Sequence, residues 1–203
     1  SYTASTRGHM KNSGFFSNIA ISINENQLFS LHGRVDEHNT TGLNSTYKIN
    51  FAQNINNHSI GLIHSTGLRN PSLYELYGSD NFGIVGNTNL NPEKSETNEI
   101  NINTKFSKNL SLSASFYRTK IYDRIETNSS YTTYENFDSS INQEGVETNF
   151  IYSNNSNYFS LFINSSKSRK SGDSHQARRP DLSYGFSFLK EIDILTIEDL
   201  SLN

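Results

Sequence analysis

The chain has 203 residues, a net charge of −3, three prolines and no cysteine. Without cysteine there are no disulfides, zinc–thiolate sites or cysteine nucleophiles. No run of ~18 apolar residues predicts a transmembrane helix, and the mild charge, with no basic stripe, argues against nucleic-acid binding.

An alternation of apolar and polar residues with a period of two runs through most of the chain. In 110–116 the even positions are apolar or small (Leu110, Leu112, Ala114, Phe116) and the odd positions are serines. Such alternation gives a strand one apolar and one polar face, which we expect to meet lipid and lumen respectively. It predicts strands over 14–24, 27–37, 43–53, 58–68, 96–106, 109–124, 132–153, 157–167, 179–190 and 193–203.

The connections between these predicted strands alternate in length. Short polar turns are expected at 24–26, 54–57, 107–108 and 154–156, and longer loops at 38–42, 69–95, 125–131 and 168–178. Short turns on one side and longer loops on the other are typical of transmembrane β-barrels. The predicted fold is therefore all-β, an antiparallel transmembrane β-barrel; a soluble β-sandwich would have shorter strands and no such sidedness.

The longest break in the strand pattern, 67–99, contains Pro71 and Pro92 and an apolar cluster too rich for a solvated linker. Long loops of this kind are usually functional. We expect Tyr74, Tyr77 and Phe82 to stack on a flat, bulky ligand, with oxygen atoms from Asp80 and Asn81 beside them. The alternative is a loop that only packs onto the barrel mouth. The acidic spacing is not that of an EF-hand, so no metal site and no cofactor are expected.

Two blocks of this stretch carry a family resemblance. GLRNPSLYELYG over 67–78, and GNTNLNPEKS over 86–95 followed by Glu99, resemble the barrel signature of TonB-dependent outer-membrane receptors, most closely the vitamin B12 (cobalamin) receptor group. Shorter similar blocks lie at 117–125, 134–136, 145–147 and 178–180, so that the resemblance covers 35–189.

The resemblance implies a 22-stranded barrel around an N-terminal plug. With about ten predicted strands, 1–203 is then expected to be a fragment of the barrel domain, without the plug domain and its TonB-contacting segment. Residues 1–13 also lack the apolar segment of a signal peptide. The implied location is the outer membrane of a Gram-negative bacterium.

The resemblance also implies a function, the energy-dependent import of a scarce, large nutrient. Vitamin B12 is the first candidate cargo, and a ferric siderophore or haem is the next. The implied partners are the TonB complex (through the missing plug segment), the cobalamin or iron chelate, and outer-membrane lipid including lipopolysaccharide, with no nucleic acid.

Other functions remain open at this stage. A passive porin or a surface adhesin would lack a plug, and an outer-membrane protease or lipase would use Asp36 and His38 at a strand end. A lone Asp-x-His with no nucleophile motif is weak support, so no enzyme is expected. Tyr131, Tyr134 and Tyr184 are candidates for an aromatic girdle, and Arg178 and Arg179 for contacts to phosphates or acidic ligands at the rim.

Overall fold

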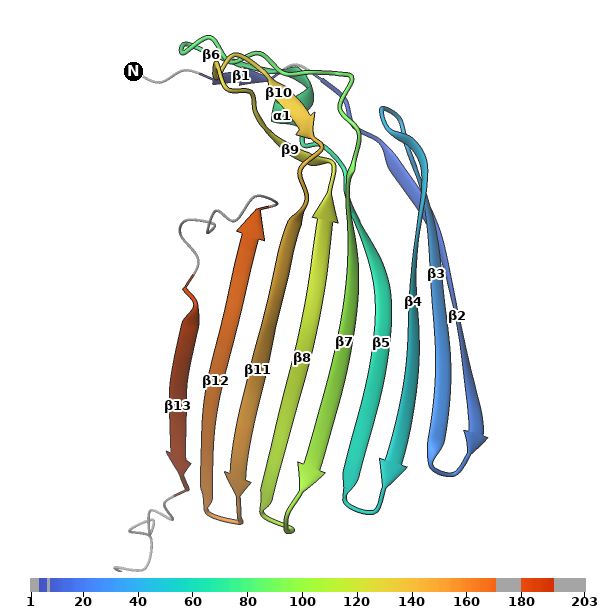
Figure 1. The fold of residues 1–203 in the computed structure, drawn as a ribbon, viewed down its shortest axis with the longest axis vertical. Coiled ribbons are helices and arrows are strands. Elements are labelled where there is room, and N and C mark those ends of the chain that lie inside the picture. Colours follow the sequence, from blue (N-terminus) through green and yellow to red (C-terminus); the bar gives the residue numbers. More distant parts are fainter. Residues whose placement is uncertain (1–3, 7, 171–179, 192–203) are drawn as a thin grey trace, which may run out of the picture.

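The computed structural model describes residues 4–6, 8–170 and 180–191, and one nine-stranded antiparallel sheet dominates it (Figure 1). The order across the sheet is β13-β12-β11-β8-β7-β5-β4-β3-β2. The strands are β2 (Asn12–Asn24), β3 (Gln27–His38), β4 (Gly42–Ile55), β5 (His58–Arg69), β7 (Glu93–Lys105), β8 (Leu110–Tyr122), β11 (Ile141–Ser153), β12 (Asn157–Lys170) and β13 (Leu182–Lys190). Sequential neighbours pair throughout, so the predicted antiparallel meander is confirmed over these strands.

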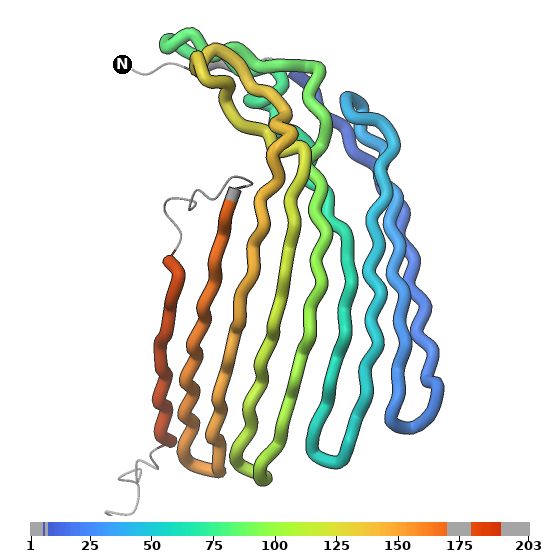
Figure 2. The backbone as a smooth tube through the Cα atoms, viewed as in Figure 1, coloured from blue at the N-terminus to red at the C-terminus, as the bar shows by residue number. Residues whose placement is uncertain are grey.

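The sheet is a curved strip whose two ends differ (Figure 2). At one end, tight hairpin turns join β2 to β3, β4 to β5, β7 to β8 and β11 to β12. At the other end lie the short helix α1 (Leu73–Tyr77) and four short strands, β1 (Ala4–Thr6), β6 (Gly78–Asp80), β9 (Arg124–Thr127) and β10 (Tyr134–Phe137). A strand of 13 residues such as β7 rises about 44 Å, enough to cross a ~25 Å lipid band at a tilt of about 40°.

The register divides the side chains of the sheet between two faces. On the polar face, Ser115 pairs with Asn101 on β7 and with Glu147 on β11. On the apolar face, Phe116 pairs with Ile100 and Val146 in the same way. The apolar face stays uncovered, and Phe186 on β13 is 76% exposed. The predicted division of 110–116 into opposite faces is thus confirmed, and such an apolar face fits contact with lipid.

The predicted strand 132–153 is wrong, because the chain leaves the ladder between Phe137 and Ile141. Asp123 takes a left-handed conformation (φ 53°) at the end of β8. The chain then forms a separate β9–β10 hairpin before β11 begins. The guanidinium of Arg124 donates to the Ser139 carbonyl at 3.2 Å and to its Oγ at 3.1 Å, which holds the bend. The nine described strands of the main sheet thus correspond to nine of the ten predicted strands, with β11 shorter than predicted, and the tenth, 193–203, lies outside the described residues.

The expected difference between the two ends holds for the two longest connections that the structure describes in full. Residues 70–92 join β5 to β7, and 123–140 join β8 to β11. The β3–β4 connection is shorter than expected, a turn of residues 39–41. Among the described residues, no helix is long and apolar enough to cross a membrane.

Candidate functional site

The candidate site is a compact assembly of three chain excursions at the end of the sheet opposite the short turns (Figure 1). We call it the loop platform: β1, residues 70–92 with α1 and β6, and the β9–β10 hairpin. β1 pairs with β6, and Val85 bridges both Ser79 in β6 and Thr133 beside β10. The excursions are therefore hydrogen-bonded to one another rather than independent loops.

Helix α1 forms because its first turn is capped within the sequence PSLYEL. The Ser72 Oγ accepts from the Glu75 backbone N–H at 3.2 Å, and the Glu75 carboxylate accepts from the Ser72 N–H at 2.7 Å. This reciprocal capping box satisfies two donors that a helix otherwise leaves open. Pro71, which is almost fully buried, precedes the cap and cannot continue the β5 ladder.

Arg69 fixes this helix to the end of the sheet. Its guanidinium donates to both carboxylate oxygens of Glu93 on β7, at 2.7 and 2.8 Å. It also donates to both oxygens of Glu75, at 3.0 and 3.1 Å. Two bidentate pairs use the planar fork of arginine in a way that lysine does not reproduce. Arg69 and Glu93 lie on the polar face by register, so the loop platform is anchored on that side.

A small apolar core lies beneath the loop platform. Leu76, Leu90 and Ile125 are 1%, 4% and 7% exposed, and Tyr77 and Tyr134 pack against them. These residues come from α1, from the segment after β6 and from the β9–β10 hairpin. Their burial joins excursions that are distant in the sequence, and burial of an aliphatic side chain contributes about 1.5–3 kcal/mol.

The GNTNLNP block provides close packing and polar contacts for the same assembly. A Cβ on Gly86 would lie 2.6 Å from backbone atoms of Leu76 and Tyr77, so only glycine fits there. The Asn87 amide donates to the Tyr134 carbonyl at 2.9 Å. Asn91 and Asn136 exchange two hydrogen bonds of 2.8 and 2.9 Å.

Three of the five predicted ligand contacts hold the loop platform together. The Tyr74 hydroxyl donates to Asp80 Oδ2 at 3.0 Å, and its ring packs edge-on against Tyr134 with centroids 6.2 Å apart. Tyr77 packs on the apolar core, and its hydroxyl lies 3.4 Å from Thr40 Oγ1. Asp80 Oδ1 accepts from the backbone N–H groups of Phe82 and Ile84, at 2.9 and 3.1 Å.

The pKa of Asp80 is lowered. Burial acts to raise it, and this effect is outweighed by hydrogen bonds from the Ile84 N–H, the Tyr74 hydroxyl and the backbone N–H groups of Phe82 and Gly83. An ionised Asp80 therefore shapes the turn that carries the other two predicted residues, Asn81 and Phe82.

Asn81 and Phe82 form the exposed tip of this turn. Phe82 is 78% exposed, although large apolar side chains are usually covered. Val85 and Tyr131 are also exposed on the loop platform, by 57% and 69%. Sequence reasoning missed both as surface contacts. For Tyr131 the sequence does hold a signal of surface exposure, a large aromatic residue in the otherwise polar turn Asn-Ser-Ser-Tyr. Its backbone is left-handed, with φ 55°.

The girdle interpretation is wrong for Tyr131 and Tyr134, which belong to the loop platform. Tyr184 does lie on the apolar face of β13, 75% exposed. Arg178 and Arg179 lie outside the described residues.

The Asp-x-His pair has structural contacts of its own. Asp36 accepts two hydrogen bonds from Arg34, at 2.6 and 2.7 Å. His38 is 2% exposed, and its Nδ1 faces the backbone N–H groups of Thr40 and Thr41, at 3.2 and 3.3 Å. These contacts order the β3–β4 turn. Across the described residues, no three His, Asp or Glu side chains gather as a metal site would require.

Comparison with known proteins fits this architecture. The family model described as "TonB dependent receptor-like, beta-barrel" matches residues 1–192. No curated protein matches the chain.

Three solved structures with a similar fold are receptors or transporters. The siderophore receptor PirA from Pseudomonas aeruginosa is 18% identical, with a TM-score of 0.69 over 78% of this chain and 32% of that one. The copper transporter OprC is 15% identical, with a TM-score of 0.71 over 91% and 33%. The ferripyoverdine receptor of the Pseudomonas aeruginosa outer membrane is 14% identical, with a TM-score of 0.71 over 88% and 26%.

The chain spans about a third or less of these three proteins. The family whose model matches is a receptor family and not an enzyme family, in agreement with the expectation from the sequence. With 1–192 matched and a partial barrel sheet observed, the chain belongs to the TonB-dependent receptor-like β-barrel family, proteins of the Gram-negative outer membrane.

Proposed function

We propose that 1–203 is part of the barrel domain of a longer outer-membrane receptor, and that this receptor imports a scarce, bulky nutrient by TonB-dependent active transport. The TonB complex would supply the work through a plug domain encoded elsewhere in the receptor. Family membership supports this proposal, and it is preferred to a passive porin or adhesin because the two motif blocks have structural roles in the loop platform.

The observation that carries the proposal is the ordered loop platform on the polar-face side of the sheet. In a closed barrel the polar face lines the lumen. An assembly anchored there by Arg69, Glu75 and Glu93 stands over the entrance. Because it is already packed, it presents a binding surface without the entropic cost of ordering a free loop.

The proposed cargo is a bulky metal chelate, with a ferric siderophore as the first candidate. The similar solved structures include siderophore receptors and a copper transporter, which favours metal cargo. Cobalamin is the second candidate, because the blocks at 67–78 and 86–95 resemble those of the cobalamin receptor group.

The predicted ligand-contact residues have two roles in this proposal. Phe82 and Asn81, at the exposed tip, contact the cargo directly, and Phe82 supplies a large apolar surface at low entropic cost. Tyr74, Tyr77 and Asp80 hold the tip in place and shape the wall beneath it. Tyr131, exposed on the adjacent hairpin, extends the same aromatic surface.

The test is equilibrium binding of ferric siderophores and of cyanocobalamin to the complete receptor in detergent. Phe82→Ala combined with Tyr131→Ala should weaken cargo binding at least tenfold, because it removes the two aromatic side chains proposed to contact the cargo. Both side chains are mostly exposed, so we expect the double variant to keep the fold. The matched control is Phe106→Ala, a 58% exposed phenylalanine at the short-turn end, which should bind like wild type.

If the double variant binds a cargo as tightly as wild type, the loop platform only caps the barrel and the proposed contact residues are wrong. If wild type binds no siderophore and no cobalamin, the cargo assignment fails. Energy-dependent uptake by whole cells, with and without an intact TonB complex, separates the receptor from a porin.

A further inference from the structure

The ladder of the wall is incomplete between β4 and β5. These two strands pair with each other only from their shared turn up to Lys48 and Ser65. Beyond that pair, β4 continues with β3 as its only partner, and β5 continues with β7 as its only partner. Figure 1 shows β4 and β5 diverging toward the loop platform. We call this unpaired stretch, 42–47 opposite 66–69, the seam.

Backbone hydrogen-bonding groups are left open along the seam. The Tyr47 N–H points toward β5, because it donates to Thr66 Oγ1 at 2.9 Å. Backbone groups alternate in direction along an antiparallel strand, so those of Leu43 and Ser45 point into the seam as well. Among the described residues, neither these two nor Leu68 on the opposite edge forms a backbone hydrogen bond outside the ladders with β3 and β7. Unpaired edges of this kind readily pair with another strand.

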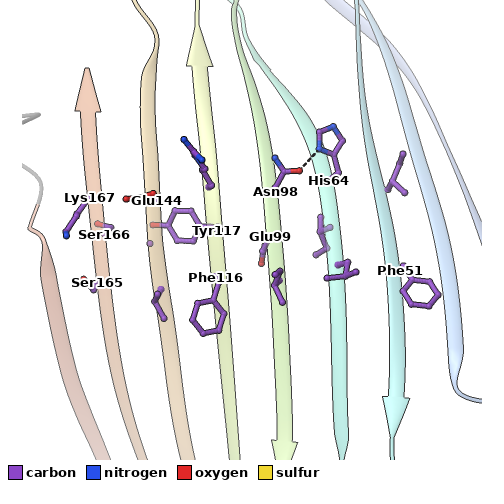
Figure 3. Close-up of a pocket in the computed structure, with 17 residues that line it drawn as sticks. Phe51, His64, Asn98, Glu99, Phe116, Tyr117, Glu144, Ser165, Ser166 and Lys167 are labelled. Atoms are coloured by element: carbon purple, nitrogen blue, oxygen red, sulfur yellow. Dashed lines mark hydrogen bonds between the residues drawn. The ribbon is translucent and has the colours of Figure 1, made fainter. Parts of the chain in front are cut away.

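The lower end of the seam is tied to three strands. The Tyr47 hydroxyl on β4 lies 3.1 Å from His64 Nε2 on β5. His64 Nδ1 in turn lies 2.9 Å from Asn98 Oδ1 on β7 (Figure 3). The Thr66 hydroxyl also takes the place of the backbone carbonyl that the next pair of a continuous ladder would offer to the Tyr47 N–H. This end therefore has the contacts of a hinge.

The upper end of the seam is linked to the loop platform. In the β3–β4 turn, Thr41 Oγ1 donates to Asn70 Oδ1 at 2.9 Å, and Thr40 Oγ1 lies 3.4 Å from the Tyr77 hydroxyl. Tyr77 packs on the apolar core of the loop platform. A shift of the β3–β4 turn is therefore passed on to the loop platform through these side chains.

A cleft of about 690 Å³ lies at the seam. Leu43 and Tyr47 line it from β4, Thr66 and Leu68 from β5, and Lys94 from β7. Space rather than packed side chains separates the two strand edges here. The edges can therefore approach each other without displacing a core.

The upper end of β5 is drawn toward β7 and the loop platform. A Cβ on Gly67 would lie 2.5 Å from Ser95 Oγ, so glycine allows β5 and β7 to lie close together at this point. Arg69 holds the end of β5 to Glu93 and Glu75. The contacts of the loop platform thus oppose the pairing of 66–69 with β4.

We propose that the seam has two states, the open one described here and a closed one in which the β4–β5 ladder continues as far as Asn44 opposite Arg69. Closure pairs the open backbone groups of Ser45 and Leu68. It also moves the β3–β4 turn relative to the loop platform, so that the entrance changes width with the state of the seam. The link to cargo passage rests on the proposed import function, whereas the two states of the wall do not depend on it.

Pairs of introduced cysteines in the complete receptor, cleared of any other cysteine, test for the closed state. There, Ser45→Cys and Leu68→Cys would face each other with Cα atoms about 5.5 Å apart, a distance that suits a disulfide. Leu43→Cys with Leu68→Cys is the matched control, because its partners are offset by about 7 Å along the strand. With diamide as the oxidant, the first pair should cross-link at least tenfold faster than the control pair.

Thr66→Val should shift the seam toward the closed state. Valine keeps the shape of the side chain but removes the hydroxyl that accepts from the Tyr47 N–H in the open state. An unpaired donor is costly, so cross-linking of the Ser45→Cys and Leu68→Cys pair should accelerate at least threefold. Thr97→Val is the control; it removes a hydroxyl that faces Thr119 elsewhere in the wall and should leave the rate unchanged.

Uptake by whole cells tests the link to the entrance. Oxidation of the Ser45→Cys and Leu68→Cys receptor should reduce ferric siderophore or cobalamin uptake at least tenfold, and dithiothreitol should restore it. Phe51→Cys with Leu62→Cys is the control, because this pair already faces each other in the ladder. Its cross-link should form readily and leave uptake unchanged.

Equal cross-linking rates for the seam pair and its offset control would overturn the closed state, and so would an unchanged rate in Thr66→Val. Undiminished uptake by the cross-linked receptor would overturn the link between the seam and the entrance. If wild type takes up neither cargo, the proposed function fails and the link to uptake fails with it. The cross-linking rates, which require no cargo, then still decide whether the seam closes.

Discussion

Arg69 and Glu93 face each other across the ends of β5 and β7, joined by hydrogen bonds of 2.7 and 2.8 Å. The same guanidinium binds Glu75, whose carboxylate also caps α1. The Glu93 carboxylate in turn accepts from the Ile125 N–H at 2.9 Å, which brings in the β9–β10 hairpin. One arginine thus joins the sheet, the helix and, through Glu93, a distant hairpin.

Arg69→Lys should loosen the loop platform while the sheet stays intact. Lysine keeps the charge but cannot form both bidentate pairs. The Arg69 side chain is 46% exposed, so solvent screening limits the loss to roughly 1–2 kcal/mol. Hydrogen exchange should accelerate in 72–92 and remain unchanged in β7 and β8. Arg34→Lys, at the separate Arg34–Asp36 pair, is the control and should leave 72–92 unaffected; equal exchange in wild type and Arg69→Lys would contradict this role.

Gly86→Ala should open the loop platform for steric reasons. The added Cβ would meet the Leu76 and Tyr77 backbone at 2.6 Å, and relief of such overpacking costs about 1–3 kcal/mol. The expected result is faster cleavage of 70–92 by an external protease on intact cells. Gly33→Ala is the matched control, because a Cβ there meets nothing within 4 Å. Unchanged cleavage in Gly86→Ala would show that the neighbouring backbone shifts freely.

The tip that carries Phe82 should loosen in acid. Because the pKa of Asp80 is lowered in the folded chain, its contribution to stability is complete above the ordinary value of 3.8. It is lost as the pH falls through the lower folded value. The chain has no cysteine, so a spin label on Asn81→Cys can report the mobility of the tip. Mobility should rise only below about pH 4; in Asp80→Asn it should be high and independent of pH. A rise near neutral pH would point to another group.

Spin labels along β8 should report two environments that alternate. Positions 112, 114 and 116 share the apolar face with Ile102 and Ile100, and should be accessible to oxygen dissolved in lipid. Positions 111, 113 and 115 share the polar face with Asn103 and Asn101, and should be accessible to a water-soluble reagent. An accessibility profile that does not alternate, or that follows a helical period, would contradict the assignment of the two faces.

Most strands of the sheet could be predicted from the sequence, because the alternation of apolar and polar residues that indicates a strand is a local pattern. Leu112, Ser113, Ala114 and Ser115 already reveal their faces through alternation, and each short polar turn marks the end of a strand. The failure at 132–153 has a physical cause. The prediction takes Tyr134–Phe137 as the start of one long strand, yet its partner is Arg124–Thr127 and not the main ladder. That choice depends on the bend held by Arg124, which no local pattern reveals.

The candidate site was predicted as a segment but not as an arrangement. The length and composition of 67–99 identified the segment. The division of its aromatics did not follow from the sequence, because Tyr74 and Tyr77 are held by contacts with Asp80, Tyr134 and Thr40. Phe82 resembles them in sequence and has 78% of its surface exposed. Exposure is set here by long-range packing, which periodicity does not encode.

The way the loop platform is joined implies an order of assembly. Asn91 and Asn136 are 45 positions apart, whereas the β2–β3, β4–β5, β7–β8 and β11–β12 hairpins of the wall close through turns of a few residues. Contacts between distant positions form late, because closing a long loop costs entropy before any contact repays it. The hairpins of the barrel wall can therefore form before the contacts of the loop platform at its outer entrance. A defect in Asn91, Asn136 or Gly86 would then show itself first as weak capture of cargo, in receptors whose walls have inserted correctly.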